Sequence, residues 1–156
     1  GTSFNYKGIS LSANFAYSKG NQVYNYSREL YDADGAYPTY NQQVLADGWN
    51  RWQAPGDIAT HPRAVYGGNN LSNKTSSRYL EDGSFLRMRN VRLGYTLDSQ
   101  WISNLGLTNL NLYISGDNLW TITDFSGMDP EVGVGGTYNA LYPVAKRLTV
   151  GVSASF

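Results

Sequence analysis

The chain has 156 residues, with 12 basic and 12 acidic side chains and a formal net charge of zero. This balance gives no basic surface for nucleic acid, and the lack of cysteine excludes a disulfide framework and a thiolate metal site. Thirteen tyrosines, four tryptophans and 17 glycines suit a membrane β-barrel with aromatic girdles, although a secreted β-sandwich has a similar composition. No apolar run approaches the roughly 18 residues of a membrane helix.

Two strands are predicted at the N-terminal end. Residues 1–6 read as the end of a strand, Lys7-Gly8 as a tight turn, and 9–18 as the next strand. In the second strand, large apolar residues alternate with small or polar ones, so the two kinds lie on opposite faces. The larger set is Ile9, Leu11, Ala13, Phe15 and Tyr17.

A long loop is predicted from 19 to about 82, where the sequence has no sustained period of two and contains turn signals such as Asp34-Gly35. Two pieces of it, 23–31 and 42–52, could be short helices. A loop of this length argues against a compact soluble domain. In outer-membrane barrels, however, long extracellular loops alternate with short periplasmic turns.

Alternation returns in three later segments, which predict antiparallel strands near 85–97, 107–123 and 145–156. A short connection at 98–106 and a second long, glycine-rich loop at 124–143 separate them. We expect one common face to carry Ile9, Leu11, Val91, Leu93, Leu110, Leu112, Val150 and Val152.

Phe156 ends the apolar row of the last strand. Outer-membrane barrels commonly end on such an aromatic residue, which lies in the interfacial girdle. Five strand segments cannot close a barrel, because the smallest natural barrels need about eight. We therefore interpret residues 1–156 as an all-β, C-terminal fragment of a transmembrane barrel, with the loops 19–82 and 124–143 outside the cell. Such a protein needs a signal peptide, so we expect the natural N-terminus to lie upstream.

Three motifs resemble the SusC/RagA family of TonB-linked outer-membrane transporters. Tyr79–Leu97 reads YLEDGSFLRMRNVRLGYTL and is similar to the family's EDGSFLRLKNLTLGYTL-like stretch near its C-terminus. Tyr113–Thr121, YISGDNLWT, is similar to its SGQNLFT, and Gly127–Val132, GMDPEV, to its GxDPEV. Tyr142-Pro143 and the terminal phenylalanine complete a resemblance that runs in order along nearly the whole chain.

The resemblance implies a multi-pass barrel of about 22 strands in the outer membrane of a Gram-negative bacterium, plugged by an N-terminal domain that is absent here. It implies energy from TonB through the missing N-terminal region, a SusD-like surface lipoprotein, and import of oligosaccharides or peptides. It also implies that barrel-assembly machinery recognises Phe156.

Polar positions on the strands are the candidate contacts to lumen and plug. These are Arg92, Asn111, Tyr113 and Asp117. Two alternatives stay open for Arg87 and Arg89. Strict parity turns them outward, near the outer interface and lipopolysaccharide phosphates, whereas a bulge near Met88 would turn them into the lumen.

Trp49 and Trp52 in the long loop are candidates for contact with substrate or a lid protein, although we favour a role in the loop's own small core. His61 has no nucleophile or orienting carboxylate indicated near it, so a loop histidine is favoured over catalysis. Asp32-Ala33-Asp34-Gly35 lacks the spaced ligands and terminal glutamate of a calcium loop and reads as an acidic turn. The sequence therefore predicts no catalytic, cofactor or metal site.

Two other functions fit parts of the sequence. A soluble, secreted carbohydrate-binding β-domain would use the aromatic and amide side chains as a sugar platform. An outer-membrane enzyme would need an acid, a base and a nucleophile clustered at the extracellular rim. A requirement for detergent separates the transporter fragment from the soluble domain.

Overall fold

The computed structural model describes residues 1–41, 44–68, 70–97, 99–132 and 135–156. They form two compact units. The first contains residues 1–21, 83–124 and 143–156, and the second contains 22–82 and 125–142. Among the helices in the described ranges, none is long and apolar enough to cross a membrane.

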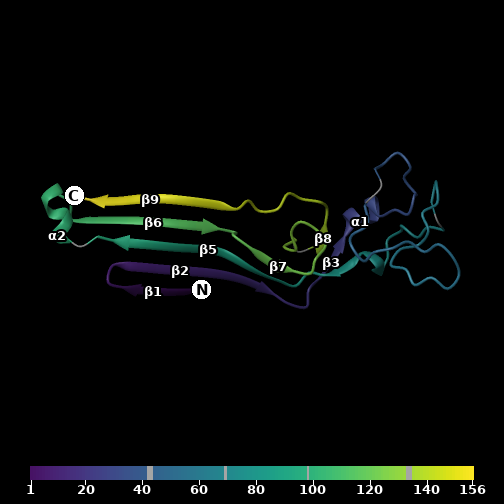
Figure 1. The fold of residues 1–156 in the computed structure, drawn as a ribbon, viewed down its shortest axis with the longest axis horizontal. Helices are drawn as coiled ribbons and strands as arrows, with labels where there is room; N and C mark the ends of the chain where they lie inside the picture. The colour runs from purple at the N-terminus through teal and green to yellow at the C-terminus, as the bar shows by residue number, and fades with distance from the viewer. Residues whose placement is uncertain (42–43, 69, 98, 133–134) are drawn as a thin grey trace. The chain divides into compact units, whose positions relative to one another are not determined.

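The first unit is an antiparallel sheet (Figure 1). Its neighbouring strands are β1 (Thr2–Tyr6), β2 (Ile9–Ser18), β5 (Phe85–Thr96), β6 (Asn109–Asp117) and β9 (Arg147–Ser155), and a short β7 (Thr121–Thr123) also pairs with β5. As far as the described residues go, the sheet is open, because β1 and β9 lie at its two ends in the strand order. The predicted antiparallel pairing is therefore confirmed, and no closed barrel is seen within the described residues.

Strand register places the large apolar residues on one face. Leu11 lies opposite Leu93, Leu93 opposite Ile114, and Ile114 opposite Val150. Residues directly opposite one another in a sheet share a face, so the predicted common face is confirmed. Most of its side chains are exposed, from 42% for Leu11 to 78% for Val150, while Val91 and Leu110 are half-buried. The sheet thus presents a broad apolar surface that no second layer covers within the described residues.

A bulge in β5 decides between the two alternatives for Arg87. Asn14 pairs with Asn90 but Phe15 pairs with Met88, so Arg89 is the extra residue. The shift brings Arg87 opposite Ala16, on the face away from the apolar row. There Arg87 is 3% exposed, and its Nε donates to Thr121 Oγ1 at 3.0 Å. Strict parity was therefore the wrong alternative for Arg87.

The predicted single strand over 107–123 is two strands. Asn118 has φ +51°, a left-handed conformation that a continuous strand does not contain. After this break the chain resumes as β7, which pairs with Phe85–Arg87 at the start of β5. Leu86 lies opposite Ile122, so the apolar face continues past the break.

Short turns join the strands at one end of the sheet. Lys7-Gly8 joins β1 to β2, and a connection containing α2 (Ser99–Ile102) and the 3-10 turn η2 (Ser103–Leu105) joins β5 to β6. Gly106 ends this turn with φ +70°, which glycine adopts without a Cβ clash. Strand β9 ends at the same end of the sheet, because Ser155 pairs with Asn109 at the start of β6 (Figure 1).

The second unit contains elements that the sequence did not predict. A small sheet has the order β4 (Leu80–Asp82), β3 (Gln22–Asn25), β8 (Thr137–Tyr138), with β8 parallel to β3. The helix expected over 23–31 is confined to α1 (Tyr26–Tyr31), and a 3-10 turn η1 (Ser77–Tyr79) precedes β4.

The second expected helix is not found among the described residues. Residues 44–52 of the predicted 42–52 segment are not helical, and 42–43 lie outside the described residues. The unit has a small apolar core instead, in which Val23, Phe125 and Tyr138 pack together with Val132 against them.

Candidate functional site

The polar face of the sheet brings together the predicted lumen-facing residues. Arg92 and Tyr113 lie on neighbouring strands, and the Arg92 guanidinium lies 3.8 Å from the centre of the Tyr113 ring. Such a cation–π contact orients the cation and leaves its N–H groups at the ring's edge. Asn111 Nδ2 donates to Thr96 Oγ1 at 2.9 Å, and Asn90 Nδ2 donates to Asp117 Oδ1 at 2.6 Å.

Glycines beside Tyr113 give its ring room. Tyr113 lies opposite Gly94 on β5 and Gly151 on β9. A Cβ on Gly151 would overlap the Tyr113 ring atoms, so the ring lies across the backbone of β9. Tyr113 is thus flanked by a glycine on each neighbouring strand, which leaves room for its ring.

The second unit holds a buried ionic cluster, which we call the Asp32–Asp34 cluster. Its two carboxylates are 0% and 1% exposed. Asp34 accepts from Arg51 at 2.7 Å, Arg78 at 2.5 Å and Ser72 Oγ at 2.7 Å. Asp32 pairs with Arg28 at 3.2 Å, with Arg78 at 3.2 Å and with His61 Nε2 at 2.9 Å. Arg28 continues to Glu81 at 3.0 Å.

The cluster shifts the titration of its members. Burial raises the pKa of Asp34, but hydrogen bonds from Arg78, Ser72 and Arg51 outweigh it and leave this pKa below its ordinary value. Burial also opposes ionisation of Glu81, yet its bonds with Ser126 and Arg28 lower its pKa. For His61, burial lowers the pKa, and the attraction of Asp32 only partly offsets this. Burial raises the pKa of Tyr79, beside the cluster, to about 12.

His61 has partners that were not visible in the sequence. Its Nε2 faces Asp32, and its Nδ1 lies 2.8 Å from Thr60 Oγ1. A carboxylate, an imidazole and a hydroxyl thus follow one another, as in a catalytic triad. However, Asp32 also neutralises Arg28 and Arg78, and the Thr60 hydroxyl is tied to the Asn50 backbone at 2.9 and 3.0 Å. These shared partners indicate a structural role.

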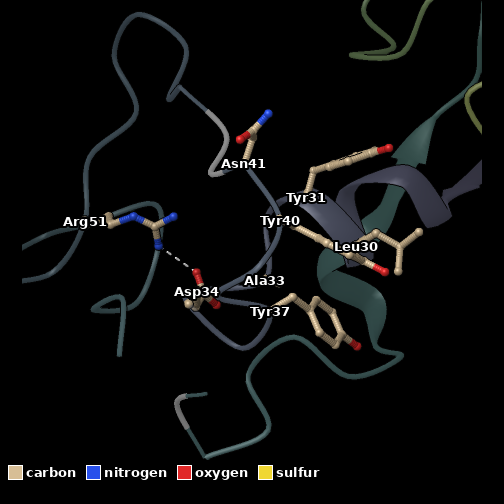
Figure 2. Close-up of a pocket in the computed structure, with 9 residues that line it drawn as sticks. Leu30, Tyr31, Ala33, Asp34, Tyr37, Tyr40, Asn41 and Arg51 are labelled. Atoms are coloured by element: carbon tan, nitrogen blue, oxygen red, sulfur yellow. Dashed lines mark hydrogen bonds and ion pairs between the residues drawn. The ribbon is translucent and has the colours of Figure 1, made fainter. Parts of the chain in front are cut away.

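The sequence had suggested an acidic turn and a loop histidine here. The carboxylates are instead buried and neutralised by arginines on three separate segments. Figure 2 shows Arg51 extending to Asp34 from a different stretch of the loop. Among the described residues, no group of three or more His, Asp or Glu is placed to hold a metal ion.

Both candidate tryptophans are half-buried and stack on arginines. Trp49 lies under the Arg28 guanidinium at 4.8 Å, and its ring centre is 4.9 Å from that of His61. Trp52 lies under Arg63 at 5.0 Å. Trp49 therefore packs against the Asp32–Asp34 cluster. Contact of either residue with substrate or a lid protein stays a prediction.

Comparison with known proteins gives a consistent result over almost the whole chain. No protein-family model matches it. TonB-dependent receptor P26 of Formosa agariphila is 32% identical over 163 residues, which cover 97% of this chain and 16% of the receptor. TonB-dependent receptor P3 of the same organism is 29% identical, with 97% and 15% covered. TonB-dependent receptor SusC of Bacteroides thetaiotaomicron is 32% identical over 83 residues, or 52% of this chain and 8% of SusC.

Solved structures agree. The RagAB peptide importer in its "closed-closed" state matches with a TM-score of 0.80 and 30% identity, and in its "open-open" state with 0.80 and 28%. Each match covers 97% of this chain and 16% of the other.

The chain is homologous to a segment of about 160 residues in SusC/RagA-type TonB-dependent receptors. It spans about 15% of the length of the curated relatives that it matches. The SusC/RagA resemblance predicted from the motifs is thus confirmed. These relatives are TonB-dependent transporters, which are not enzymes, and they point to the outer membrane of Gram-negative bacteria.

Proposed function

We propose that this chain forms the C-terminal strands and outer loops of a TonB-dependent importer in the outer membrane. The observation that carries the proposal is the sheet with one exposed apolar face and one polar face that carries Arg92 and Tyr113. In a membrane barrel the first face contacts lipid and the second lines the lumen or contacts the plug. The open ends at β1 and β9 then pair with strands from the rest of the protein, because unpaired strand edges are costly in lipid.

The cargo and partners follow from the relatives. RagAB is described as a peptide importer, and the RagAB complex implies a RagB/SusD-like partner. We propose that the present protein likewise works with a SusD-like surface lipoprotein. Oligosaccharides or peptides are its proposed cargo, and TonB acts through the N-terminal region. The second unit, which contains the long loops, lies on the extracellular side in this proposal, where it meets cargo and lipoprotein.

The test is energised uptake by the full-length protein in cells. Labelled peptide and oligosaccharide mixtures are offered to cells with and without TonB, and uptake is divided by the amount of folded protein. We expect cells to accumulate one of the two cargo classes. This accumulation should disappear without TonB and should require the SusD-like lipoprotein. Uptake that is unaffected by loss of TonB would overturn the proposal, as would a protein that is stable and monodisperse without detergent.

The soluble carbohydrate-binding alternative finds less support. A soluble sheet buries one face against a second layer, whereas the apolar row from Leu11 to Val150 stays exposed across neighbouring strands. Burying such a row in lipid is the arrangement that outer-membrane barrels use.

A further inference from the structure

The second unit contains a cavity of about 750 Å³. It lies between α1, the Ala46–Trp49 stretch, the Ser126–Met128 stretch and β8. Its volume lies within the roughly 300–1,000 Å³ of typical small-molecule sites, so it has room for a large side chain of a bound molecule.

Carbon atoms dominate the cavity walls. Tyr31, Trp49, Met128 and Tyr138 line it. Two of the aromatic rings have partners elsewhere: Trp49 lies under Arg28, and Tyr138 packs edge-on against Phe125 at 5.2 Å. The third, Tyr31, is 54% exposed. The Tyr138 hydroxyl accepts from Met128 N–H at 3.1 Å. The Met128 side chain is 69% exposed, and its flexible thioether can adapt to a bound group.

Several polar groups of the walls bond within the protein, whereas Ser27 Oγ and Arg28 Nε are buried without a partner among the described residues. Asn25 Nδ2 donates to Glu81 at 3.1 Å and to Ser126 Oγ at 3.2 Å. Ser126 Oγ in turn donates to Glu81 at 2.8 Å. The terminal nitrogens of Arg28 pair with Asp32 and Glu81. A polar occupant would therefore lose hydrogen bonds to water and regain few of them.

We propose that this cavity binds an apolar side chain, such as phenylalanine or leucine, of a peptide cargo. The inference rests on the proposed import function and adds the part of the cargo that the loop unit recognises. A sugar ring needs free hydrogen-bonding groups around each of its hydroxyls, whereas Asn25, Ser126 and the terminal nitrogens of Arg28 already bond within the protein. An apolar side chain needs only removal from water, which contributes about 1.5–3 kcal/mol.

The test is equilibrium binding to the full-length protein in detergent. Three neutral probes are compared: a blocked Gly-Gly-Phe-Gly-Gly peptide, the same peptide with serine in the centre, and maltopentaose. We expect the phenylalanine peptide to bind at least about tenfold more tightly than the serine peptide, the factor that 1.4 kcal/mol gives.

Two variants place the binding in the cavity. Met128→Glu puts a carboxylate at its wall, and Ala46→Trp fills it from the opposite segment. Both should weaken binding of the phenylalanine peptide at least about tenfold. Ile58→Glu is the matched control, because Ile58 is 94% exposed in the same unit and does not line the cavity. It should change affinity less than about twofold. Heat-modifiable migration checks that each variant is folded.

Several results would overturn the inference. The first is equal or undetectable binding of the phenylalanine and serine peptides. The second is binding of maltopentaose that is tighter than that of the phenylalanine peptide and that Met128→Glu abolishes. The third is an unchanged affinity for the phenylalanine peptide in both folded cavity variants. TonB-dependent uptake is measured separately on the same proteins. Failure of the importer proposal would abolish the TonB dependence but leave the binding preference intact, so the two failures are distinguishable.

Discussion

At the scale of single residues, buried charge organises the second unit. Asp32 and Asp34 pair with three guanidinium groups, which belong to Arg28 in α1, Arg51 in the long loop and Arg78 in η1. A buried carboxylate without a partner is costly, whereas one with several donors is tolerated. The cluster therefore links segments that lie far apart in the sequence.

Arg78 contacts both carboxylates of the cluster, so we expect Arg78→Met to loosen the second unit. Removing one partner of a buried pair costs on the order of 3 kcal/mol, because a charge stays behind unpaired. Arg63→Met is the control, since Arg63 is an exposed arginine stacked on Trp52 in the same unit. Native-state hydrogen exchange measures the opening free energy of both. Similar losses in the two variants would contradict this account.

Acid should open the second unit in two steps. The pKa of His61 is lowered from 6.5 in the fold, so the unfolded segment binds the extra proton and stability falls as pH drops below about 6.5. The pKa values of Asp34 and Glu81 lie below 3.8 and 4.5, so their contribution is lost only as pH falls through these lower values. His61→Gln should remove the first step and keep the second. Exchange protection that is flat from pH 7 to 4 would contradict the prediction.

At the scale of elements, the register of the sheet depends on one bulge and one break. Arg89 is inserted in β5, and Asn118 interrupts the strand between β6 and β7. Alternation is a local signal, so 9–18 and the C-terminal strand could be read directly from sequence. A bulge appears only when a strand meets its partner, which is why the orientation of Arg87 could not be predicted from parity.

The Asp32–Asp34 cluster was hidden for a different reason. His61 lies 29 residues from Asp32, and Arg78 lies 44 residues from Asp34. Charged residues in a loop usually face water, and no periodicity marks those that fold inward. Only the tertiary fold brings them together, so the sequence indicated a loop but not its ionic core.

A double substitution tests the register on the polar face. Gly151→Val should destabilise the folded protein by about 1–3 kcal/mol, because its side chain would overlap the Tyr113 ring. Tyr113→Ala removes the ring, so adding Gly151→Val in that background should cost much less. The temperature at which the folded band is lost on a gel measures the stability of the single and the double variant. Additive losses would mean that Tyr113 does not lie over Gly151.

At the scale of the whole molecule, the sheet leaves an apolar face uncovered within the described residues. Val150 is 78% exposed and Phe156 91% exposed. Phe156 follows β9 at the end of the apolar row, where a barrel strand meets the periplasmic interface. We therefore propose that it acts in assembly.

Deleting Phe156 from the full-length protein should lower the amount of folded barrel in the outer membrane. Molecules that do insert should transport nearly normally, because the residue faces lipid in this proposal and does not meet cargo. Heat-modifiable protein and uptake per folded copy are measured together. Unchanged folded levels, or lost uptake at unchanged levels, would show another role.

The central claim is that the apolar face meets lipid and the polar face meets water or the plug. The chain has no cysteine, so single cysteines can be introduced along β9 and spin-labelled in the full-length protein in membranes. Labels at Leu148, Val150 and Val152 should be accessible to oxygen dissolved in lipid, and labels at Thr149 and Ser153 to a water-soluble nickel chelate or to neither reagent. Accessibility to the chelate at both sets, without alternation, would contradict the account.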